Sequence, residues 1–305
     1  MKKLIVIVVM SLLFFDVSYA KKYKLNDVVQ NEFYLNKNFI IDLPEGKWVV
    51  AEKSSGNYYQ LVSKIYTLVR LLDNRAVEAI EIGELKTAGV YQYIVDQAIY
   101  ESLFKNKYDG CYERPEYTVL EFYQKGSTHN CFWLGHTDLY KDLFTPEDPN
   151  IKNAKLKKWI TQNNVELPKV ALFSNHAYFS RFKAGNWYLV SYYIDPNELD
   201  APKNKFISEE ASEYHKNNID NHPEHKKIMK KWISISAQRH IDFENSIKVI
   251  DNHKLSLDKF NPIKSDLNDS NSNDIIDQLQ KLDDLFKNGV LTEEEFIKAK
   301  KKLLK

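Results

Sequence analysis

Runs of apolar residues in the first third of the chain predict β-hairpins. Phe39 to Leu43 has the pattern of a short strand that stops at the turn sequence Pro44-Glu45-Gly46. A longer run from Tyr58 to Leu72 is rich in Tyr, Val and Ile, and a second run follows from Arg75 to Leu85. The two runs are separated only by Asp73-Asn74, so we expect them to pair as an antiparallel hairpin.

The middle of the chain predicts four more strands. Residues 117–123 and 131–135 have the pattern of short strands, and residues 170–182 and 187–194 that of a second hairpin. The last of these segments carries aromatic residues on both of its faces, namely Trp187, Tyr188, Tyr192 and Tyr193. A strand that is apolar on both faces is usually central and covered on both sides.

Helical spacing of apolar residues appears between and after these strands. It predicts helices over residues 87–105, 151–163 and 208–219, and a longer helix that begins at Pro223. The buried stripe expected for the longer helix is Ile228, Met229, Trp232, Ile235 and Phe243. We therefore predict an α+β domain over residues 21–250, with a mainly antiparallel sheet and helices packed on it.

The last 55 residues change in character twice. Residues 251–273 are polar and follow neither period, which indicates a flexible linker. Residues 274–305 carry apolar residues at three- and four-residue steps on both sides of Asn288-Gly289, and Thr292 to Glu295 forms a capping-box sequence. This pattern predicts a two-helix hairpin, and its contact residues are Leu279, Leu282, Leu285, Phe286, Gly289, Thr292, Glu295, Phe296, Leu303 and Leu304.

This C-terminal segment resembles a known family. The series L-x-x-L-x-x-L-F-x-x-G-x-L-T-x-E-E-F, followed by Lys301-Lys302-Leu303-Leu304, is similar to the SHOCT family of short C-terminal domains. The resemblance implies an interaction or oligomerisation role without catalysis. The length of the segment agrees with this role, because domains below about 40 residues usually need another surface to be stable. Self-association, a protein partner and docking on the parent domain are the alternatives.

A shorter resemblance concerns the first predicted strand. Residues 39–48, Phe-Ile-Ile-Asp-Leu-Pro-Glu-Gly-Lys-Trp, are similar to the opening strand and turn of PsbP-like α+β domains of exported bacterial proteins. It covers ten residues and bears only on the fold.

The first 20 residues have the pattern of a cleaved signal peptide. Lys2 and Lys3 precede an apolar run from Leu4 to Phe15, and Ser18-Tyr19-Ala20 supplies small residues at the cleavage site. The run is too short for a helix that crosses the bilayer, although an uncleaved anchor is the alternative. We therefore expect a periplasmic or secreted bacterial protein with no membrane span after cleavage.

Export changes what is expected of the two cysteines. Cys111 and Cys131 are the only cysteines in the chain, and an even number in an oxidising compartment predicts a disulfide. Two free thiols, one of them catalytic, are the alternative. Neither cysteine lies in a sequence typical of cysteine proteases.

Charge and glycine spacing exclude several functions. With 43 Lys+Arg against 42 Asp+Glu, the chain lacks the basic surface that a nucleic-acid-binding protein needs. Its nine glycines are too widely spaced for the common phosphate-binding loops, so we expect neither a nucleotide cofactor nor a nucleic-acid partner.

Candidate catalytic and metal-binding residues are few. A hydrolase would use His176, or His129 and His136, with a carboxylate such as Glu116, Glu121 or Asp138. No G-x-S-x-G sequence accompanies these histidines. His215, His222 and His225 match no usual zinc spacing, so we expect no metal.

Tyrosines in the predicted hairpins are the remaining candidates for a ligand site. A cleft would be lined by Tyr58, Tyr66, Tyr178, Tyr188 and Tyr192. The sequence thus favours an exported, non-catalytic binding or interaction protein. A periplasmic hydrolase with a His/carboxylate site is the alternative.

Overall fold

The computed structural model describes nine parts of the chain: residues 22–36, 38–58, 61–87, 118–125, 128–144, 154–180, 186–203 and 208–247, and seven residues between 282 and 299. Their strands are β1 (Val28–Val29), β2 (Glu32–Asn36), β3 (Phe39–Asp42), β4 (Trp48–Tyr58), β5 (Leu61–Leu72), β6 (Arg75–Thr87), β7 (Thr118–Lys125), β8 (Thr128–Thr137), β9 (Ala171–Ser180) and β10 (Asn186–Ile194). The helices are α3 (Leu139–Phe144), α4 (Ala154–Gln162), the 3-10 helices η2 (Pro196–Leu199) and η3 (Ile219–Asn221), and α5 (Pro223–Ser246).

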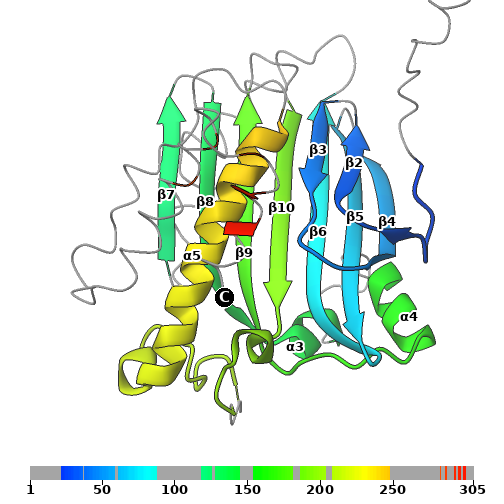
Figure 1. Ribbon diagram of the computed structural model, residues 1–305. Coiled ribbons are helices and arrows are strands. Elements are labelled where there is room, and N and C mark those ends of the chain that lie inside the picture. Colours follow the sequence, from blue (N-terminus) through cyan, green and yellow to red (C-terminus); the bar gives the residue numbers. More distant parts are fainter. Residues whose placement is uncertain are drawn as a thin grey trace, which may run out of the picture.

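Eight of these strands form one antiparallel sheet in the order β1-β4-β5-β6-β10-β9-β8-β7 (Figure 1). It consists of two meanders, β4 to β6 and β7 to β10, joined where β6 pairs with β10. The predicted α+β class with a mainly antiparallel sheet is confirmed. The predicted turn at Asp73-Asn74 is also confirmed. Both residues have positive φ, 48° and 66°, as a tight two-residue hairpin turn requires. β10 is central, as its two apolar faces predicted.

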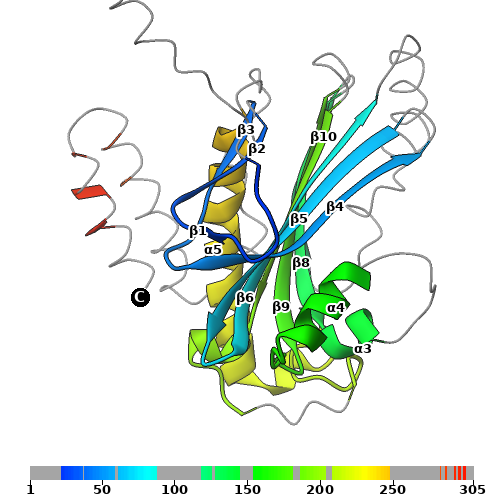
Figure 2. The ribbon, with the colours of Figure 1, turned by 90° about the vertical axis from the view of Figure 1, so that its right-hand side faces the viewer.

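Different elements cover the two faces of the sheet. The β2–β3 hairpin and α5 lie on one face, and α3 and α4 lie on the other (Figures 1 and 2). The larger core lies between the sheet and the first pair of elements. A smaller core lies beneath α4, which contributes Leu156, Trp159 and Ile160. Side chains alternate between the two faces along a strand, and each face of the sheet packs against a hydrophobic core.

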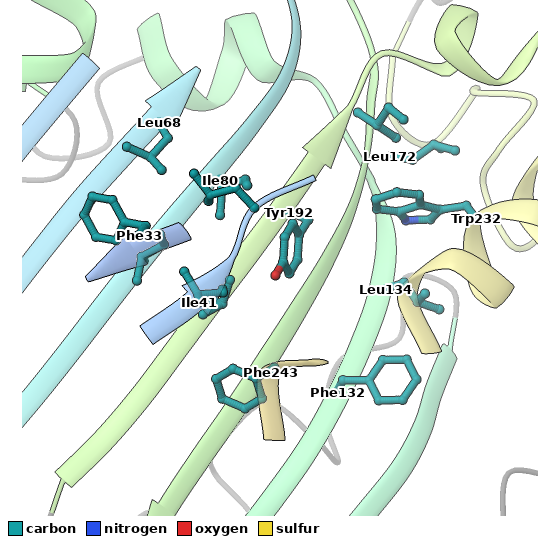
Figure 3. Packing of buried hydrophobic residues seen from close by; sticks show 14 of the residues in the cluster. Phe33, Ile41, Leu68, Ile80, Phe132, Leu134, Leu172, Tyr192, Trp232 and Phe243 are labelled. Carbon is teal, nitrogen blue, oxygen red and sulfur yellow. The ribbon is translucent and has the colours of Figure 1, made fainter. Parts of the chain in front are cut away.

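The larger core is held by aromatic residues from α5 and the hairpin. Figure 3 shows Trp232 and Phe243 of α5 beside Phe132 and Leu172 of the sheet. Both α5 residues are fully buried, and the Nε1 of Trp232 donates to the backbone oxygen of Phe173 at 3.1 Å. Burial of one such side chain contributes about 1.5–3 kcal/mol to folding. The helix predicted from Pro223 is thus confirmed. Four of the five predicted stripe residues are buried, and Ile235 is half-buried against the same core.

One predicted helix is wrong. Residues 208–219 form a series of turns that ends in η3, because polar side chains bond to the local backbone in place of helical carbonyls. The hydroxyl of Ser208 accepts from the N–H of Ala211, and that of Ser212 accepts from the N–H of Tyr214. The Nδ2 of Asn218 donates to two backbone oxygens of the same segment. The helix predicted over residues 87–105 lies, apart from Thr87 at the end of β6, outside the described residues.

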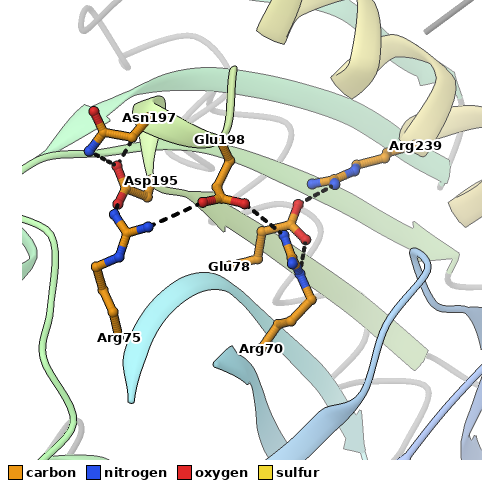
Figure 4. A network of polar contacts seen from close by, with 7 residues as sticks. All are labelled: Arg70, Arg75, Glu78, Asp195, Asn197, Glu198 and Arg239. Carbon is orange, nitrogen blue, oxygen red and sulfur yellow. Dashed lines mark hydrogen bonds and ion pairs between the residues drawn. The ribbon is translucent and has the colours of Figure 1, made fainter. Parts of the chain in front are cut away.

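Arginine is rare in this chain, yet three of its five arginines meet in one network (Figure 4). Glu78 on β6 accepts from Arg70 of β5 at 2.9 Å and from Arg239 of α5 at 3.0 Å. The remaining ion pairs join Arg75 to Asp195, and Glu198 to both Arg70 and Arg75. Because arginine presents several donors in a fixed plane, one guanidinium can join two carboxylates. The network therefore ties the β5–β6 hairpin to the end of β10 and, through Arg239, to α5.

We predict that Glu78→Gln lowers the free energy of unfolding by about 2–4 kcal/mol, because it leaves two partly buried guanidinium groups without their shared carboxylate. Urea unfolding followed by circular dichroism measures the change. Asp220→Asn is the matched control: Asp220 pairs with Lys226 but is 77% exposed, so its loss should cost less than about 1 kcal/mol. Equal losses in the two variants would contradict a structural role for the network.

Candidate functional site

The capping box predicted in the C-terminal segment is present. The backbone N–H and the hydroxyl of Thr292 donate to the Glu295 carboxylate at 3.0 and 2.7 Å, and the N–H of Glu295 donates to the Thr292 hydroxyl at 3.3 Å. These bonds satisfy backbone donors at the start of the second helix. They also hold the pKa of Glu295 below its usual value, because both groups of Thr292 stabilise the carboxylate.

An aromatic contact joins the two sides of the predicted hairpin. The rings of Phe286 and Phe296 stack with centroids 4.6 Å apart and an interplanar angle of 22°. Leu282 is helical and only 8% exposed, whereas Phe286 is 36% exposed. The described residues of this segment lie on the α5 side of the sheet (Figure 2). The other predicted contact residues, Leu279, Leu285, Gly289, Leu303 and Leu304, lie outside the described residues.

A chain of polar side chains crosses the core beneath α5. The Nδ1 atoms of His176 on β9 and His240 on α5 are 3.0 Å apart, and the Nε2 of His176 lies 3.0 Å from the Ser174 hydroxyl. On its other side, His240 Nε2 faces the carboxyl group of Glu244 at 3.8 Å, and Asn130 of β8 donates to the same carboxyl oxygen.

One of the two facing Nδ1 atoms carries a proton and donates it to the other. His240 Nε2 lies beyond hydrogen-bond distance of the Glu244 carboxyl group and has no hydrogen-bond partner among the described residues. Burial lowers the pKa of His240 to about 3 and holds that of His176 well below its usual value, so both rings are neutral at pH 7.

This arrangement gives His176 a structural role. Ser174, His176, His240 and Glu244 are buried beneath α5, and the ring stacking of His176 and His240 on Phe132 fills the space around them. Sequence reasoning singled out His176 but missed His240, Glu244 and Asn130. The spacing could have indicated that His240 and Glu244 are buried. Position 240 follows 232 and 236 on the buried stripe of α5, and position 244 is one turn further along the same stripe.

The other predicted catalytic residues do not converge on His176. His136 Nε2 is 3.1 Å from the backbone oxygen of Glu209, and burial lowers its pKa. His129 lies beside Cys131, with Nε2 and Sγ 3.5 Å apart. Asp138 caps α3, since its carboxylate accepts from the N–H of Lys141 at 3.0 Å. Glu116 and the side chain of Glu121 lie outside the described residues.

Four of the five predicted cleft tyrosines belong to the larger core. Tyr66, Tyr178, Tyr188 and Tyr192 are each at most 3% exposed and face the β2–β3 hairpin and α5. Tyr66 packs edge-on against Phe33, and Tyr188 lies against Phe39. The side chain of Tyr58 lies outside the described residues. These tyrosines share one face of the sheet, and that face is covered, so they do not line an open cleft.

Cys131 is buried in a small cluster with Trp133, Phe173 and Ala177, and it is not a free thiol. Cys111 lies outside the described residues, so the bond between the two stays a prediction.

Among the described residues, His, Cys, Asp and Glu form no group of three or more that could hold a metal ion. No described helix is both long and apolar enough to cross a bilayer.

Comparison with known proteins identifies the C-terminal segment. The family model of the short C-terminal domain, SHOCT, matches residues 277–304. The resemblance seen in the sequence is thereby confirmed for this segment. No curated protein and no solved structure matches the chain. The PsbP-like resemblance of residues 39–48 stays a prediction.

We predict that the protein loses stability as the pH falls below about 6.5, the pKa of an unfolded histidine. Below that pH the unfolded chain binds protons that the buried neutral rings of His176 and His240 do not, so the free energy of unfolding falls. Each ring contributes at most about 1.4 kcal/mol per pH unit, and for His240 the loss continues until the pH nears its native pKa of about 3. Urea unfolding between pH 7.5 and 5 measures the slope.

His240→Gln should make this slope shallower by the contribution of about one histidine, whatever its effect on stability at pH 7. A wild-type stability that stays level between pH 7 and 5 would contradict the neutral, buried state of the pair.

Proposed function

We propose that the protein is an exported, non-catalytic binding protein, and that its C-terminal hairpin is the module through which it associates. The observation that carries this proposal is the SHOCT match over residues 277–304, together with the capping box and the Phe286–Phe296 contact found there. The family implies interaction, and a hairpin of this size needs a further surface for its apolar residues.

The chemistry of the α+β domain supports a role without catalysis. His176, His129 and His136, the histidines on which a hydrolase would depend, are all buried. His176 contacts His240 and Ser174, the Nε2 of His129 contacts the sulfur of Cys131, and the Nε2 of His136 contacts a backbone oxygen. Asp138 is engaged as a helix cap. An acid–base catalyst must instead be within reach of its substrate.

Export is supported by the first 20 residues and by the two cysteines. The short apolar run after Lys2-Lys3 and the small residues before Lys21 are typical of a signal peptide, and one disulfide between Cys111 and Cys131 suits an oxidising compartment. We therefore place the mature protein in the periplasm or outside the cell.

The two parts are proposed to be connected by a flexible tether. Residues 251–273 are polar, and a chain of that length spans about 25 Å on average. A module held at this distance can meet a second copy, another protein or the α5 side of its own domain.

We predict that Leu282→Asp abolishes self-association of the mature chain through the hairpin, because it places a charge where the leucine is buried. Light scattering on the wild type and the variant measures the mass. Lys298→Gln is the matched control, since it makes the same change of one charge at an exposed position of the second helix and should leave the mass unchanged.

The melting temperature of the α+β domain should stay almost constant in Leu282→Asp. An unchanged mass would mean that the hairpin is not the contact that holds the copies together. A markedly lower melting temperature would mean that it packs on its own domain, and the two-module arrangement would be wrong.

A further prediction concerns export and redox state. Mass spectrometry of the exported protein should find Lys21 at the amino terminus and a mass two hydrogens below that of the dithiol form. Cys111→Ser and Cys131→Ser should each cost about 2–4 kcal/mol of stability, and the double variant no more than either one, because both remove the same bond. An intact Met1, or alkylation of both cysteines in the folded protein, would contradict the proposal.

A further inference from the structure

Among the described residues, the outer edge of β4 is occupied only at its beginning. β1 pairs with Trp48 and Val49, and the residues before it bond to Val50 through Asn26 N–H to Val50 O and Val50 N–H to Asp27 O. Within the described part of the chain, no strand pairs with this edge over residues 52–58. In Figure 2 this edge of the sheet faces the viewer.

The side chains along this stretch leave the edge accessible. Lys53, Ser55 and Gly56 are exposed, and Ser54 is half-buried. Ser, Ser, Gly and Asn are small residues, and Lys53 is the only charge between residues 53 and 58. An open strand edge of this kind is a template for pairing with another strand, which many proteins block with bulges, prolines or several charges.

The backbone groups that point outward can be identified. The carbonyl of Lys53 accepts from the Nζ of Lys155 at 3.4 Å, so it points away from β5. In an antiparallel strand the bonding direction alternates, so Ser55 and Asn57 also present their N–H and C=O groups to the open side. Lys155 is itself exposed, and its long side chain can move aside.

We propose that this edge pairs with the same edge of a second copy of the chain. The two β4 strands run antiparallel about a two-fold axis at Ser55, so that residues 52–58 of each copy face residues 58–52 of the other. The sheet then continues from one copy into the next.

Self-complementarity favours a second copy as the partner. In this register Lys53 lies opposite Asn57, Ser54 opposite Gly56, and Ser55 opposite its own equivalent, so no like charges face each other. Ser55 is also the midpoint of the stretch that β1 and its preceding turn leave free. The pairing therefore does not compete with β1.

The apolar surface next to the edge agrees with this register. Leu25 and Val28 are among the most exposed large apolar side chains of the described residues, at 51% and 60%. They flank the occupied part of the β4 edge, and the two-fold pairing brings the end of the second copy's β4 toward them.

Cysteine crosslinking tests the register in the full mature chain. The test is made in the Leu282→Asp background, so that association through the C-terminal hairpin does not contribute. On mild oxidation Ser55→Cys should give a covalent dimer, because the two equivalent positions are directly opposite and within disulfide range. Lys53→Cys is the matched control on the same strand. Its two copies are separated by about 14 Å, so this variant should give no covalent dimer.

Ser55→Pro tests the same edge without a crosslink. The N–H that proline removes points away from β5, so thermal unfolding should be unchanged, whereas two hydrogen bonds across the two-fold axis are lost. We expect the dimer dissociation constant, measured by sedimentation in the Leu282→Asp background, to rise by about tenfold or more. Monomeric protein before substitution, or equal crosslinking of the two cysteine variants, would overturn the proposal. If Ser55→Pro does not fold, the crosslinking of Ser55→Cys compared with that of Lys53→Cys alone decides whether the β4 edges pair.

Discussion

The pairing of β6 with β10 is the constraint on which the rest of the structure depends. These strands pair over nine residues, from Asn186 opposite Lys86 to Ile194 opposite Glu78, and they join two meanders that are distant in sequence. Each meander alone would leave an apolar face uncovered and the backbone groups of one edge strand unpaired. Once joined, they form a sheet wide enough for the β2–β3 hairpin and α5 to lie side by side on one face, and the arginine network fixes the end of this junction.

Polar groups inside the larger core determine where α5 lies. A helix that packs through apolar residues alone can shift by a turn at low cost, whereas a hydrogen-bonded chain from β9 to α5 has one register. The His176–His240 contact and the Asn130–Glu244 bond supply such a register, and Arg239 adds a third point on Glu78. Of these groups, His176 looked catalytic in the sequence because catalysis and buried polar contacts use the same side chains.

Local patterns predicted most of the fold because they report directly on burial. The hairpin at Asp73-Asn74, the two-faced β10, the stripe of α5 and the capping box at Thr292 were all visible in the sequence. The segment 208–219 was not, because its side-chain bonds to the backbone outweigh its weak helical spacing. The tyrosines of the predicted cleft gave no sign in the sequence that the β2–β3 hairpin and α5 cover them. What covers a face depends on elements distant in sequence, and no local pattern carries that information.

The two proposed contacts differ in how they can combine. The proposed β4 contact is two-fold symmetric, so on its own it produces a closed pair. The proposed tether before the hairpin spans about 25 Å on average, so once two domains are paired, two hairpins would be held at high effective concentration. A weak contact between hairpins then forms between the two copies of one pair, instead of linking that pair to other pairs. A short interaction module at the end of a flexible linker therefore gains most when its parent domain also has a surface that brings copies together.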